Sequence, residues 1–323
     1  MKPFTHHNAR SIDEAITLLT KYKGKAKLNA GGTDLLGVLK ERSLPEYPEA
    51  IINIKTINGL NYIKEDEIGL KIGALTKLSE VVDSPKVKER YKVLSEAAKS
   101  VATPQVRNMG TIGGNLAQDV RCWYYRYPRH IGGPIRCLRK GNGPCLAVAG
   151  DNRYHAILGG KKCFAVCPSD TAVVLAALGA QIKISGPEGE RRVAVTDFYS
   201  PLGNGLKGNE ILTEIEVPGI TVPAKQRFLK FTLRNPIDFA IVSVASIITV
   251  EGGICTDARI VLGAVAPGPV RARKAEEVIK GRPINEDIAM MAAHEAVAGA
   301  KPLSMNIYKV EIVKTLVKRA ILS

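Results

Sequence analysis

Aromatic side chains are scarce in this sequence: Phe, Trp and Tyr make up 5% of its 323 residues. No helix-like segment carries a dense stripe of Lys and Arg interleaved with aromatic residues, the pattern with which single-strand binders stack bases. Despite the formal net charge of +15, we therefore expect no nucleic acid partner. The charge fits a solvated lysine-rich surface, an anionic ligand or an acidic protein partner.

Long apolar runs are also absent, since no stretch reaches the roughly 18 residues that a membrane span needs. Residues 1–7 contain no apolar segment typical of a secretion signal. We therefore expect a cytoplasmic protein that does not bind membranes. Disulfides are rare in that compartment, so clustered cysteines are interpreted there as metal ligands or redox groups.

The cysteines are unevenly distributed, with five of the six between residues 122 and 167 and Cys255 far away. The spacing lacks Cys-x-x-Cys, so a structural zinc ribbon fits poorly, and the compact bacterial ferredoxin run is missing too. Four thiolates suit zinc or an iron–sulfur cluster about equally well. One of the five is therefore spare, and His155 is a further candidate ligand that we interpret as a loop residue.

The cysteine-rich segment is otherwise basic and glycine-rich, which is typical of a loop with little core of its own. A metal centre would supply the cross-links that order such a segment, and the positive charge would offset an anionic cluster and ease its reduction. The alternative is that the cysteines are unligated. The basic residues are Arg121, Arg126, Arg129, Arg136, Arg139, Lys140, Lys161 and Lys162.

Two glycine-rich turns indicate a phosphate-containing ligand. The first, Ala-Gly-Gly-Thr-Asp-Leu at 30–35, lies between a predicted strand at 25–29 and a predicted helix that ends near Lys40. The second is predicted at 109–115. Neither has the P-loop or dinucleotide-binding spacing, and each alone could be a plain turn. Together they raise the expectation of a pyrophosphate bound by backbone N–H groups.

The remaining pattern predicts alternating helices and strands without internal repeats. Ser11 and Glu14 form a capping box that starts a helix ending near Tyr22. A helix over 89–101 ends at Thr103-Pro104, and we place a domain boundary near residue 220. Further helices are expected at 75–82, 170–179, 274–279, 288–298 and 307–322, and strands at 50–54, 68–72, 181–185, 191–195, 211–217, 228–234, 240–250 and 258–265.

The combination of these motifs resembles the FAD-binding subunit of the xanthine dehydrogenase (molybdenum hydroxylase) family over essentially the whole chain. The shared phrases are Gly-Gly-Thr-Asp at 31–34, Gly-Thr-Ile-Gly-Gly-Asn at 110–115, Ser169-Asp170, Lys-Phe-Thr-Leu-Arg at 230–234 with Asp-Phe-Ala at 238–240, and Gly-Ala-Val-Ala-Pro at 263–267 with Arg271-Ala272 and Ala275-Glu276. The resemblance implies an α+β fold.

The domains implied are a two-part FAD-binding domain over 1–220, a small βαβ unit over 1–55 and a larger mixed α/β unit over 56–220, followed by an α+β C-terminal domain over 221–323. An iron–sulfur insert occupies 119–167. It is similar to the insert of the 4-hydroxybenzoyl-CoA reductase β subunit, although the stretch between Cys145 and Cys163 is longer than expected for that reductase. By position the ligands of a [4Fe–4S] cluster are Cys122, Cys137, Cys145 and Cys163, and Cys167 is spare.

The resemblance also assigns FAD-binding roles. The pyrophosphate contacts fall on Leu28, Asn29, Ala30, Gly31, Gly32, Thr33, Asp34 and Leu35, and on Thr111, Gly113, Gly114, Asn115 and Gln118. Val101 lines the site through its backbone. Asp170 reaches the polar side of the flavin, and Lys230 approaches the isoalloxazine, where a cation stabilises reduced, anionic flavin. Without the resemblance, Asp170 would be read as a helix N-cap and Lys230 as an exposed strand residue.

The function implied is an electron-transfer flavoprotein subunit without catalytic residues of its own. Its partners would be a molybdenum-cofactor large subunit and a [2Fe–2S] small subunit, assembled as a dimer of heterotrimers, with an aromatic acyl-CoA as a plausible substrate at molybdenum. An acidic ferredoxin-like carrier would dock at Arg129, Arg136 and Arg139. The alternatives are a zinc-stapled binding module without redox role and a stand-alone FAD oxidoreductase.

Overall fold

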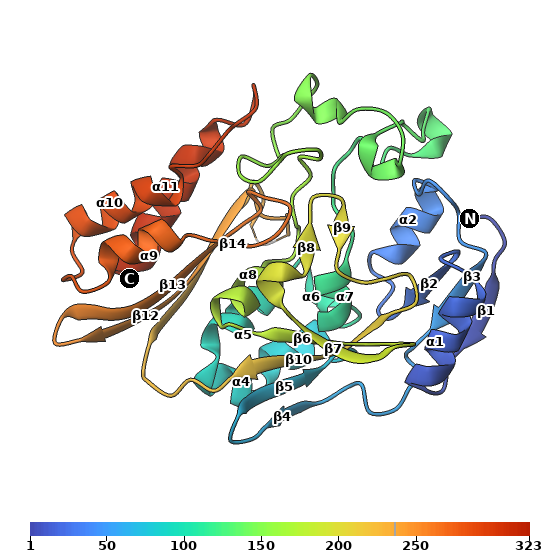
Figure 1. The fold of residues 1–323 in the computed structure, drawn as a ribbon, viewed down its shortest axis with the longest axis horizontal. Helices are drawn as coiled ribbons and strands as arrows, with labels where there is room; N and C mark the ends of the chain where they lie inside the picture. Colours follow the sequence, from blue (N-terminus) through green and yellow to red (C-terminus); the bar gives the residue numbers. More distant parts are fainter. Residues whose placement is uncertain (236) are drawn as a thin grey trace.

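The computed structural model describes residues 1–235 and 237–323. Its secondary structure forms three main sheets, a small two-stranded ribbon, covering helices and one long segment with little regular structure (Figure 1). The strands form separate sheets, and each of the three main sheets has its own helices packed beside it. This arrangement confirms the predicted α+β class. None of the helices within the described ranges is long and apolar enough to cross a membrane.

The N-terminal unit is a three-stranded parallel sheet flanked by two helices. Its strands lie in the order β1 (Thr5–Asn8), β3 (Ala50–Asn53) and β2 (Ala26–Asn29). Helix α1 (Ile12–Lys21) begins at Ser11, whose hydroxyl accepts a hydrogen bond from the backbone N–H of Glu14. The Glu14 carboxylate binds the backbone N–H of Arg10, so the capping interaction is confirmed with a shifted second partner. Helix α2 (Leu35–Glu41) follows the first glycine turn.

The second unit is a five-stranded antiparallel sheet covered by helices. Its strands lie in the order β4 (Ile63–Glu65), β5 (Gly69–Gly73), β10 (Ile211–Pro218), β6 (Gln181–Gly186) and β7 (Gly189–Ala194). The covering helices are α3 (Leu78–Asp83), α4 (Pro85–Arg90), α5 (Lys92–Lys99) and α8 (Asp170–Ala177). Every residue of α8 is buried, because sheets lie on both sides of it.

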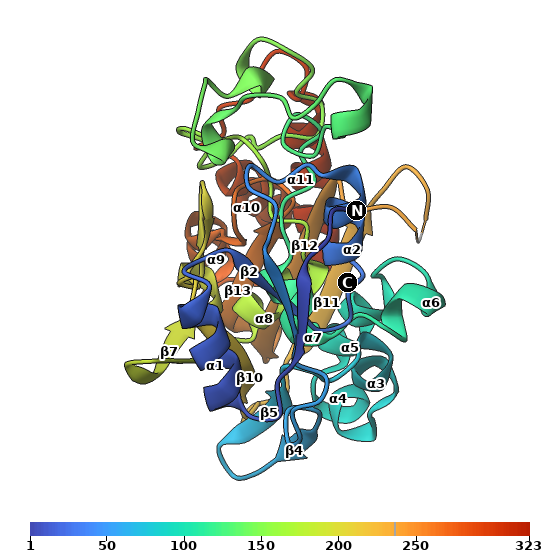
Figure 2. The same ribbon diagram turned by 90° about the vertical axis from the view of Figure 1, so that its right-hand side faces the viewer.

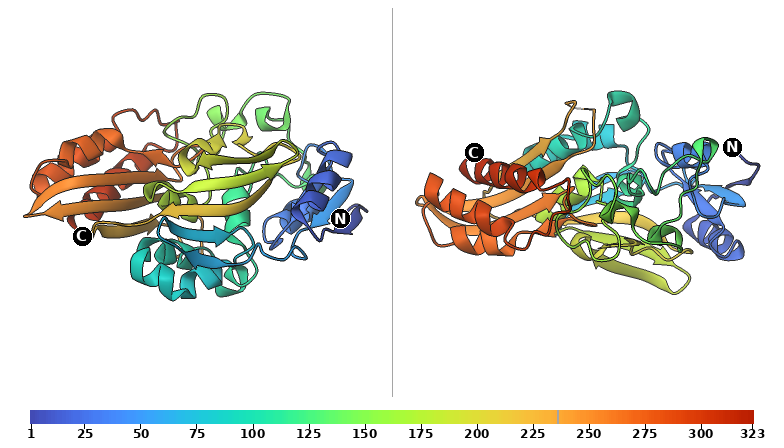
Figure 3. Two further views of the ribbon diagram at one scale, coloured as in Figure 1. Left: turned by 60° about the horizontal axis from the view of Figure 1, so that its bottom comes forward. Right: turned by 90° about the horizontal axis from the view of Figure 1, so that it is seen from above.

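The C-terminal unit is a four-stranded antiparallel sheet made of β11 (Lys225–Phe231), β12 (Val242–Glu251), β13 (Ile254–Gly263) and β14 (Val270–Arg271). Successive residues of its strands belong to different cores, as the two-residue period of a strand requires. Val244 packs with the helices α9 (Arg273–Ile279), α10 (Glu286–Ala296) and α11 (Tyr308–Leu322), whereas Ala245 joins the core around α8. Figure 3 shows the C-terminal helices and the N-terminal unit at opposite ends of the molecule.

The cysteine-rich segment runs from the end of α7 (Ile112–Ala117) to the start of α8. It contains only three short 3₁₀ turns, η1 (Arg129–Ile131), η2 (Leu138–Lys140) and η3 (Leu146–Val148). Figures 1 and 2 both show this segment, drawn in green, protruding at one end of the molecule. We call residues 119–167 the insert from here on.

Several predicted elements differ in their bounds. The single helix expected over 89–101 is wrong, because the chain breaks at the buried Tyr91 into α4 and α5. Pro104 does not merely end a helix but begins a new short one, α6 (Pro104–Arg107), which is capped by Thr103. Strand β11 begins and ends three residues earlier than predicted. The short strands β1 and β4 were not predicted from the sequence.

Candidate functional site

A cavity of about 1080 Å³ is lined by residues from all three sheet units. Fifteen of the sixteen residues predicted to bind the cofactor line it; the exception is Asn29, which lies behind the cavity wall. The fifteen are Leu28, Ala30, Gly31, Gly32, Thr33, Asp34, Leu35, Val101, Thr111, Gly113, Gly114, Asn115, Gln118, Asp170 and Lys230. We call this space the large cavity.

The two glycine turns meet at one wall of the large cavity. A Cβ added to Gly31 would overlap the backbone oxygen of Met109, so only glycine permits this approach of the two chain segments. Gly32 has a φ of 72°, in the left-handed region that favours glycine. The side-chain oxygen of Asn29 is buried beneath the first turn and has no hydrogen-bond partner. The pairing of the turns therefore explains why each is rich in glycine.

The second turn is the first turn of a helix and not a plain loop. Thr111 is the N-cap of α7, and its hydroxyl accepts from the backbone N–H of Gly114 at 3.2 Å. The backbone N–H of Gly113 donates to the carbonyl of Ala74 at 3.0 Å, and a Cβ at Gly113 would lie 2.8 Å from that oxygen. The glycines thus let α7 pack directly against the chain that follows β5.

Asn115 and Gln118 make hydrogen bonds that connect neighbouring segments of the cavity wall. The Asn115 side-chain oxygen accepts from the hydroxyls of Ser169 at 2.6 Å and Thr171 at 2.7 Å, which ties α7 to the start of α8. The Gln118 amide donates to the Asn115 carbonyl at 2.8 Å, and its oxygen accepts from Arg121 at 2.8 Å. These bonds give both residues a structural role that the sequence did not indicate.

Asp170 and Lys230 form a buried ion pair inside the large cavity. The Lys230 Nζ donates to the Asp170 carboxylate at 2.6 Å and to the backbone oxygen of Ser100 at 2.9 Å. The two side chains are 5% and 9% exposed. Burial raises the pKa of Asp170, while the Lys230 charge opposes that rise. The N-cap of α8 is Ser169, and Lys230 is not exposed, so both alternative interpretations of these residues are wrong.

Val101 lies at the same end of the cavity as Lys230. The Arg107 guanidinium donates to the backbone oxygens of Val101 and Ala102, each at 2.9 Å. Ala102 has a φ of 45°, which is unusual for a residue with a side chain. Arg107 therefore holds this strained backbone in place, a role for which the sequence carries no signal.

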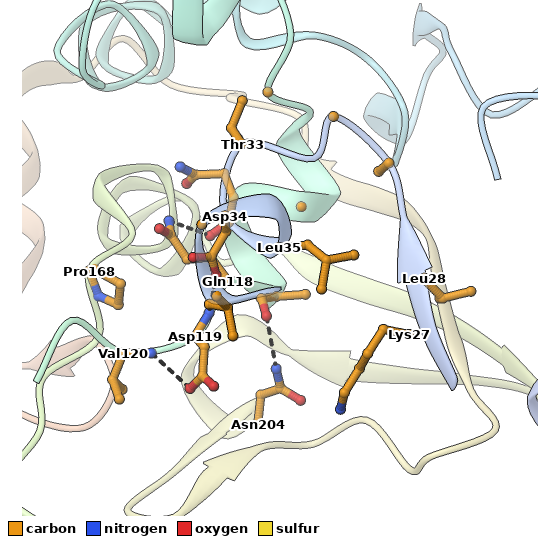
Figure 4. Close-up of a pocket in the computed structure, with 18 of the residues that line it drawn as sticks. Lys27, Leu28, Thr33, Asp34, Leu35, Gln118, Asp119, Val120, Pro168 and Asn204 are labelled. Carbon is orange, nitrogen blue, oxygen red and sulfur yellow. Dashed lines mark hydrogen bonds between the residues drawn. The ribbon is translucent and has the colours of Figure 1, made fainter. Parts of the chain in front are cut away.

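Asp34 connects the first glycine turn to the insert. Its carboxylate pairs with Arg121, with Arg126 at 2.8 Å, and with the backbone N–H of Asp119 at 2.9 Å. Burial alone would raise the pKa of Asp34, but the two guanidinium groups outweigh it and hold the pKa below its usual range. We call these four residues the Asp34 clasp; Figure 4 shows Asp34 beside Gln118 and Asp119.

Four cysteines from distant parts of the insert line one small, apolar cavity. They are Cys122, Cys137, Cys145 and Cys163, the same four that the family resemblance selects. The thiols of Cys145 and Cys163 are hydrogen-bond partners, and this hydrogen bond lowers the pKa of Cys145 to about 6. We call this space the cysteine cavity.

Cys167 and His155 lie differently from the four cysteines. Cys167 is outside the cysteine cavity; it lines the large cavity, and burial raises its pKa to about 12. His155 is buried, and its Nε2 lies 3.3 Å from the Cys122 sulfur. Its Nδ1 has no hydrogen-bond partner. His155 is thus a loop residue, as predicted, that is buried beside one cysteine.

The spacing of the four cysteines bears on what they could bind. Within residues 1–235 and 237–323, no three His, Cys, Asp or Glu side chains are grouped closely enough to hold one metal ion. Four thiolates on one zinc ion, each about 2.3 Å from the metal, would have to lie only about 4 Å apart. An iron–sulfur cubane attaches each thiolate to a different iron and so accepts a wider arrangement.

The basic residues of the insert point in two directions. Arg121 and Arg126 belong to the Asp34 clasp, and Arg139 is 10% exposed and paired with Asp119 at 3.1 Å. Arg139 is therefore wrong as a docking residue, because its charge faces inward. The exposed cations are Arg129, Arg136, Arg153, Lys161 and Lys162, of which Arg153 pairs with Asp151 at 2.7 Å.

Known families match both parts of the chain. The family described as the FAD binding domain in molybdopterin dehydrogenase matches residues 2–220. The family described as the CO dehydrogenase flavoprotein C-terminal domain matches residues 227–323.

Similar proteins cover nearly the full length. The aldehyde oxidoreductase FAD-binding subunit PaoB of Escherichia coli is 33% identical over 97% of this chain and 96% of its own. The carbon monoxide dehydrogenase medium chain of Hydrogenophaga pseudoflava is 30% identical over 98% of this chain and 96% of its own. A solved carbon monoxide dehydrogenase from Hydrogenophaga pseudoflava matches with a TM-score of 0.78 and 30% identity, over 99% of this chain and 97% of that one.

The matched families, the near-complete coverage and the glycine turns at the large cavity agree with one another. The predicted family resemblance is confirmed at this level, although none of these relatives is a 4-hydroxybenzoyl-CoA reductase. The chain belongs to the family of FAD-binding subunits of molybdopterin-dependent dehydrogenases.

Proposed function

We propose that this protein is the electron-transfer flavoprotein subunit of a molybdenum-containing hydroxylase or reductase complex. The observation that carries the proposal is the large cavity, which both glycine turns and the Asp170–Lys230 pair line. Its volume lies at the upper end of the range for small-molecule sites, about 300–1,000 Å³, and suits a dinucleotide such as FAD.

FAD is held, in this proposal, by residues at two ends of the large cavity. The turns at 28–35 and 111–118 surround the pyrophosphate, and the close approach at Gly31 removes side chains from its path. Lys230 faces the isoalloxazine, where its charge stabilises the reduced, anionic ring, and Asp170 and the Ser100 carbonyl fix the direction of its ammonium group. Bound FAD supplies an electron store that serves both one- and two-electron partners.

We further propose that the four residues of the cysteine cavity hold a [4Fe–4S] cluster. Their convergence from four points of an irregular segment supports this. Buried cations next to the cavity fit a group of net negative charge. The stretch between Cys145 and Cys163 is longer than expected for the insert of the 4-hydroxybenzoyl-CoA reductase β subunit. The fourth ligand, Cys163, is therefore the one to test first.

The partners we propose are a molybdenum-cofactor large subunit and a [2Fe–2S] small subunit in a dimer of heterotrimers. One relative is by name a FAD-binding subunit, and another is a medium chain, which supports a multi-subunit assembly. Substrate chemistry then takes place at molybdenum and not on this chain. An aromatic acyl-CoA remains our prediction for the substrate; the relatives named above act on aldehydes and carbon monoxide.

An acidic, ferredoxin-like protein is proposed as the external electron carrier. The protruding insert carries exposed cations, among them Arg129, Arg136, Lys161 and Lys162, which offer an acidic partner a complementary surface. Electrons would pass between this carrier, the cluster, FAD and the [2Fe–2S] centres of the partner subunit.

The proposal is tested by purifying the chain without oxygen and measuring flavin, iron and sulfide. We expect one FAD and about four irons per chain, the number that defines a [4Fe–4S] cluster. Cys145→Ser and Cys163→Ser should lose iron and keep FAD. The matched control Cys255→Ser, which is buried and outside both cavities, should keep both.

Each other result has a distinct meaning. If the purified chain contains FAD and zinc but no iron, the cysteines bind zinc and the insert has no iron–sulfur cluster. FAD reduced by a small substrate without partner chains would favour a stand-alone oxidoreductase. Absence of FAD and iron, also after reconstitution, would overturn the proposal.

A further inference from the structure

The large cavity and the cysteine cavity share a wall. Tyr125 and Arg139 line both cavities, so the two side chains separate them. Tyr125 follows Cys122 in the insert, and Arg139 lies on η2, which begins directly after Cys137. The elements that carry two of the four cysteines therefore also carry the wall.

This wall is held by one carboxylate. The Tyr125 hydroxyl donates to one Asp119 oxygen at 2.6 Å, and the Arg139 guanidinium donates to the other at 3.1 Å. Arg139 also donates to the backbone oxygen of Pro201 at 3.2 Å. Its guanidinium lies 5.5 Å from the centre of the Tyr125 ring. Four contacts thus fix the orientation of the wall, and we call Asp119, Tyr125 and Arg139 the partition.

The partition places fixed charges of both signs beside the cysteine cavity. The side chain of Arg139 is 10% exposed, so water screens its charge weakly. Arg136, three residues earlier, is exposed on the outer surface of the same insert. Asp119, which is also a member of the Asp34 clasp, lines the large cavity and not the cysteine cavity. The two charges of the partition therefore act on a group in the cysteine cavity with opposite signs.

We propose that the partition sets the reduction potential of the metal centre in the cysteine cavity, with Arg139 raising it and Asp119 lowering it. This inference rests on the proposed function. On reduction a [4Fe–4S] centre takes up one electron from a low-potential one-electron donor, its charge becomes more negative by one, and no bond forms or breaks. A nearby buried cation stabilises the reduced form, and a nearby carboxylate destabilises it.

The arrangement also explains why these charges lie on the shared wall and not elsewhere in the insert. A cation on the outer surface is screened by solvent and by the docked carrier's own charges. A buried cation between the two cavities exerts its electrostatic effect on the groups proposed for both of them, whether or not a carrier is docked. Arg139 is then a positioning and tuning residue that does not itself react.

The test measures the potential of the centre by electron paramagnetic resonance during a redox titration of the purified chain. Arg139→Gln should shift the one-electron equilibrium at least tenfold toward the oxidised form, equivalent to about 59 mV. Asp119→Asn, which keeps the shape of the side chain, should shift it toward the reduced form. The double variant should return close to the wild-type potential, and Arg139→Lys should stay within about threefold of it.

The matched control is Arg136→Gln, an exposed arginine of the same insert, for which we expect a change below threefold. Iron and FAD contents of all variants are measured alongside, and a purely structural role would show as lost iron and not as potentials shifted in opposite directions. If Arg139→Gln fails to fold, Asp119→Asn and Arg139→Lys carry the test.

The outcomes separate the two proposals. A wild-type chain without iron overturns the proposed cluster and this inference with it. A wild-type chain with four irons whose potential responds equally to Arg136→Gln and Arg139→Gln, or shifts in the same direction in Asp119→Asn as in Arg139→Gln, overturns this inference alone.

Discussion

The large cavity and the cysteine cavity are neighbours, but they are built from different kinds of structure. The large cavity is bordered by strands, helices and two backbone segments in direct contact at Gly31. The cysteine cavity is bordered by loops and 3₁₀ turns, and its apolar neighbourhood consists of a few residues such as Val120, Tyr125 and Ala165. The first shape follows from the packed core of the fold, whereas the second depends on contacts within the insert and on its ion pairs with the rest of the chain.

The polar contacts differ in the same way. At the large cavity the buried Asp170–Lys230 pair joins two regular elements, α8 and β11. At the insert, arginines paired with Asp34 and Asp119 supply much of the fixed geometry. A site on regular elements can therefore tolerate changes in its surroundings better than a site on an insert, and variants at the two should behave differently.

The largest effect on stability is expected for a substitution at Lys230, at the large cavity. In Lys230→Met the Asp170 carboxylate stays buried without its cation, so we expect the free energy of unfolding to fall by about 3–5 kcal/mol. Chemical denaturation of the purified chain measures this. The double variant Asp170→Asn, Lys230→Met should recover much of the loss.

Lys86→Met is the matched control, because Lys86 is exposed on α4. Its effect should stay within about 0.5 kcal/mol. Equal effects of Lys230→Met and Lys86→Met would show that the buried pair contributes nothing to stability.

Gly31→Ala tests whether the large cavity depends on the close backbone contact between Gly31 and Met109. The new methyl group would overlap the Met109 carbonyl, so we expect a loss of about 3 kcal/mol in stability, as for overpacked cores, and a loss of bound FAD. Gly37→Ala is the control: it lies on α2 with no atom near the added Cβ. It should gain about 1 kcal/mol. FAD retained at the wild-type level in Gly31→Ala would contradict the geometry.

Asp34→Asn tests the contact between the two regions. Loss of the charge in the Asp34 clasp should cost about 2 kcal/mol at pH 7, the size of hydrogen bonds to charged groups. The pKa of Asp34 is below its usual value of about 3.9. Its stabilising contribution is therefore present above pH ~4 and is lost as pH falls through the lower folded value.

The difference in stability between wild type and Asp34→Asn should accordingly vanish in strongly acidic buffer. Denaturation midpoints at several pH values measure it. A difference that is independent of pH would mean that the side chain's shape, and not its charge, is what the clasp needs.

The smallest effect on stability is expected on the outer face of the insert. Arg129→Glu with Arg136→Glu should change the free energy of unfolding by less than about 0.5 kcal/mol, because both side chains are exposed. Turnover with an acidic one-electron carrier should nevertheless slow by about tenfold at low salt, and the difference should shrink as salt screens it. Reversing two exposed lysines of α4, Lys86 and Lys88, supplies the same charge change far from the insert as a control.

Much of the fold followed from sequence patterns, and the failures have physical causes. The glycine turns, the hairpin around Gly186 and the long strands have local signals, and they lie close to their predicted positions. The break at Tyr91 has none, because it depends on the burial of that ring against other parts of the fold. Short strands such as β1 have too few residues to show a period.

The sites divide similarly. The glycines near the large cavity were identifiable because a close backbone approach requires that residue type. The direction of an arginine was not: Arg136 and Arg139 occur in similar sequence surroundings, yet one faces solvent and the other faces Asp119. The Asp34 clasp joins residues more than 80 positions apart, and no local pattern indicates such a pairing.

The Asp34 clasp has a consequence for how the protein acquires its cofactors. One carboxylate holds the first glycine turn and two arginines, Arg121 and Arg126, that lie on either side of Cys122 in the sequence. In the proposed function, filling either site would therefore pre-order part of its neighbour. Such coupling is reciprocal: the factor by which one ligand strengthens the other is the same in both directions. Loading of the two sites should therefore be cooperative in the wild type, and Asp34→Asn should leave them to fill independently.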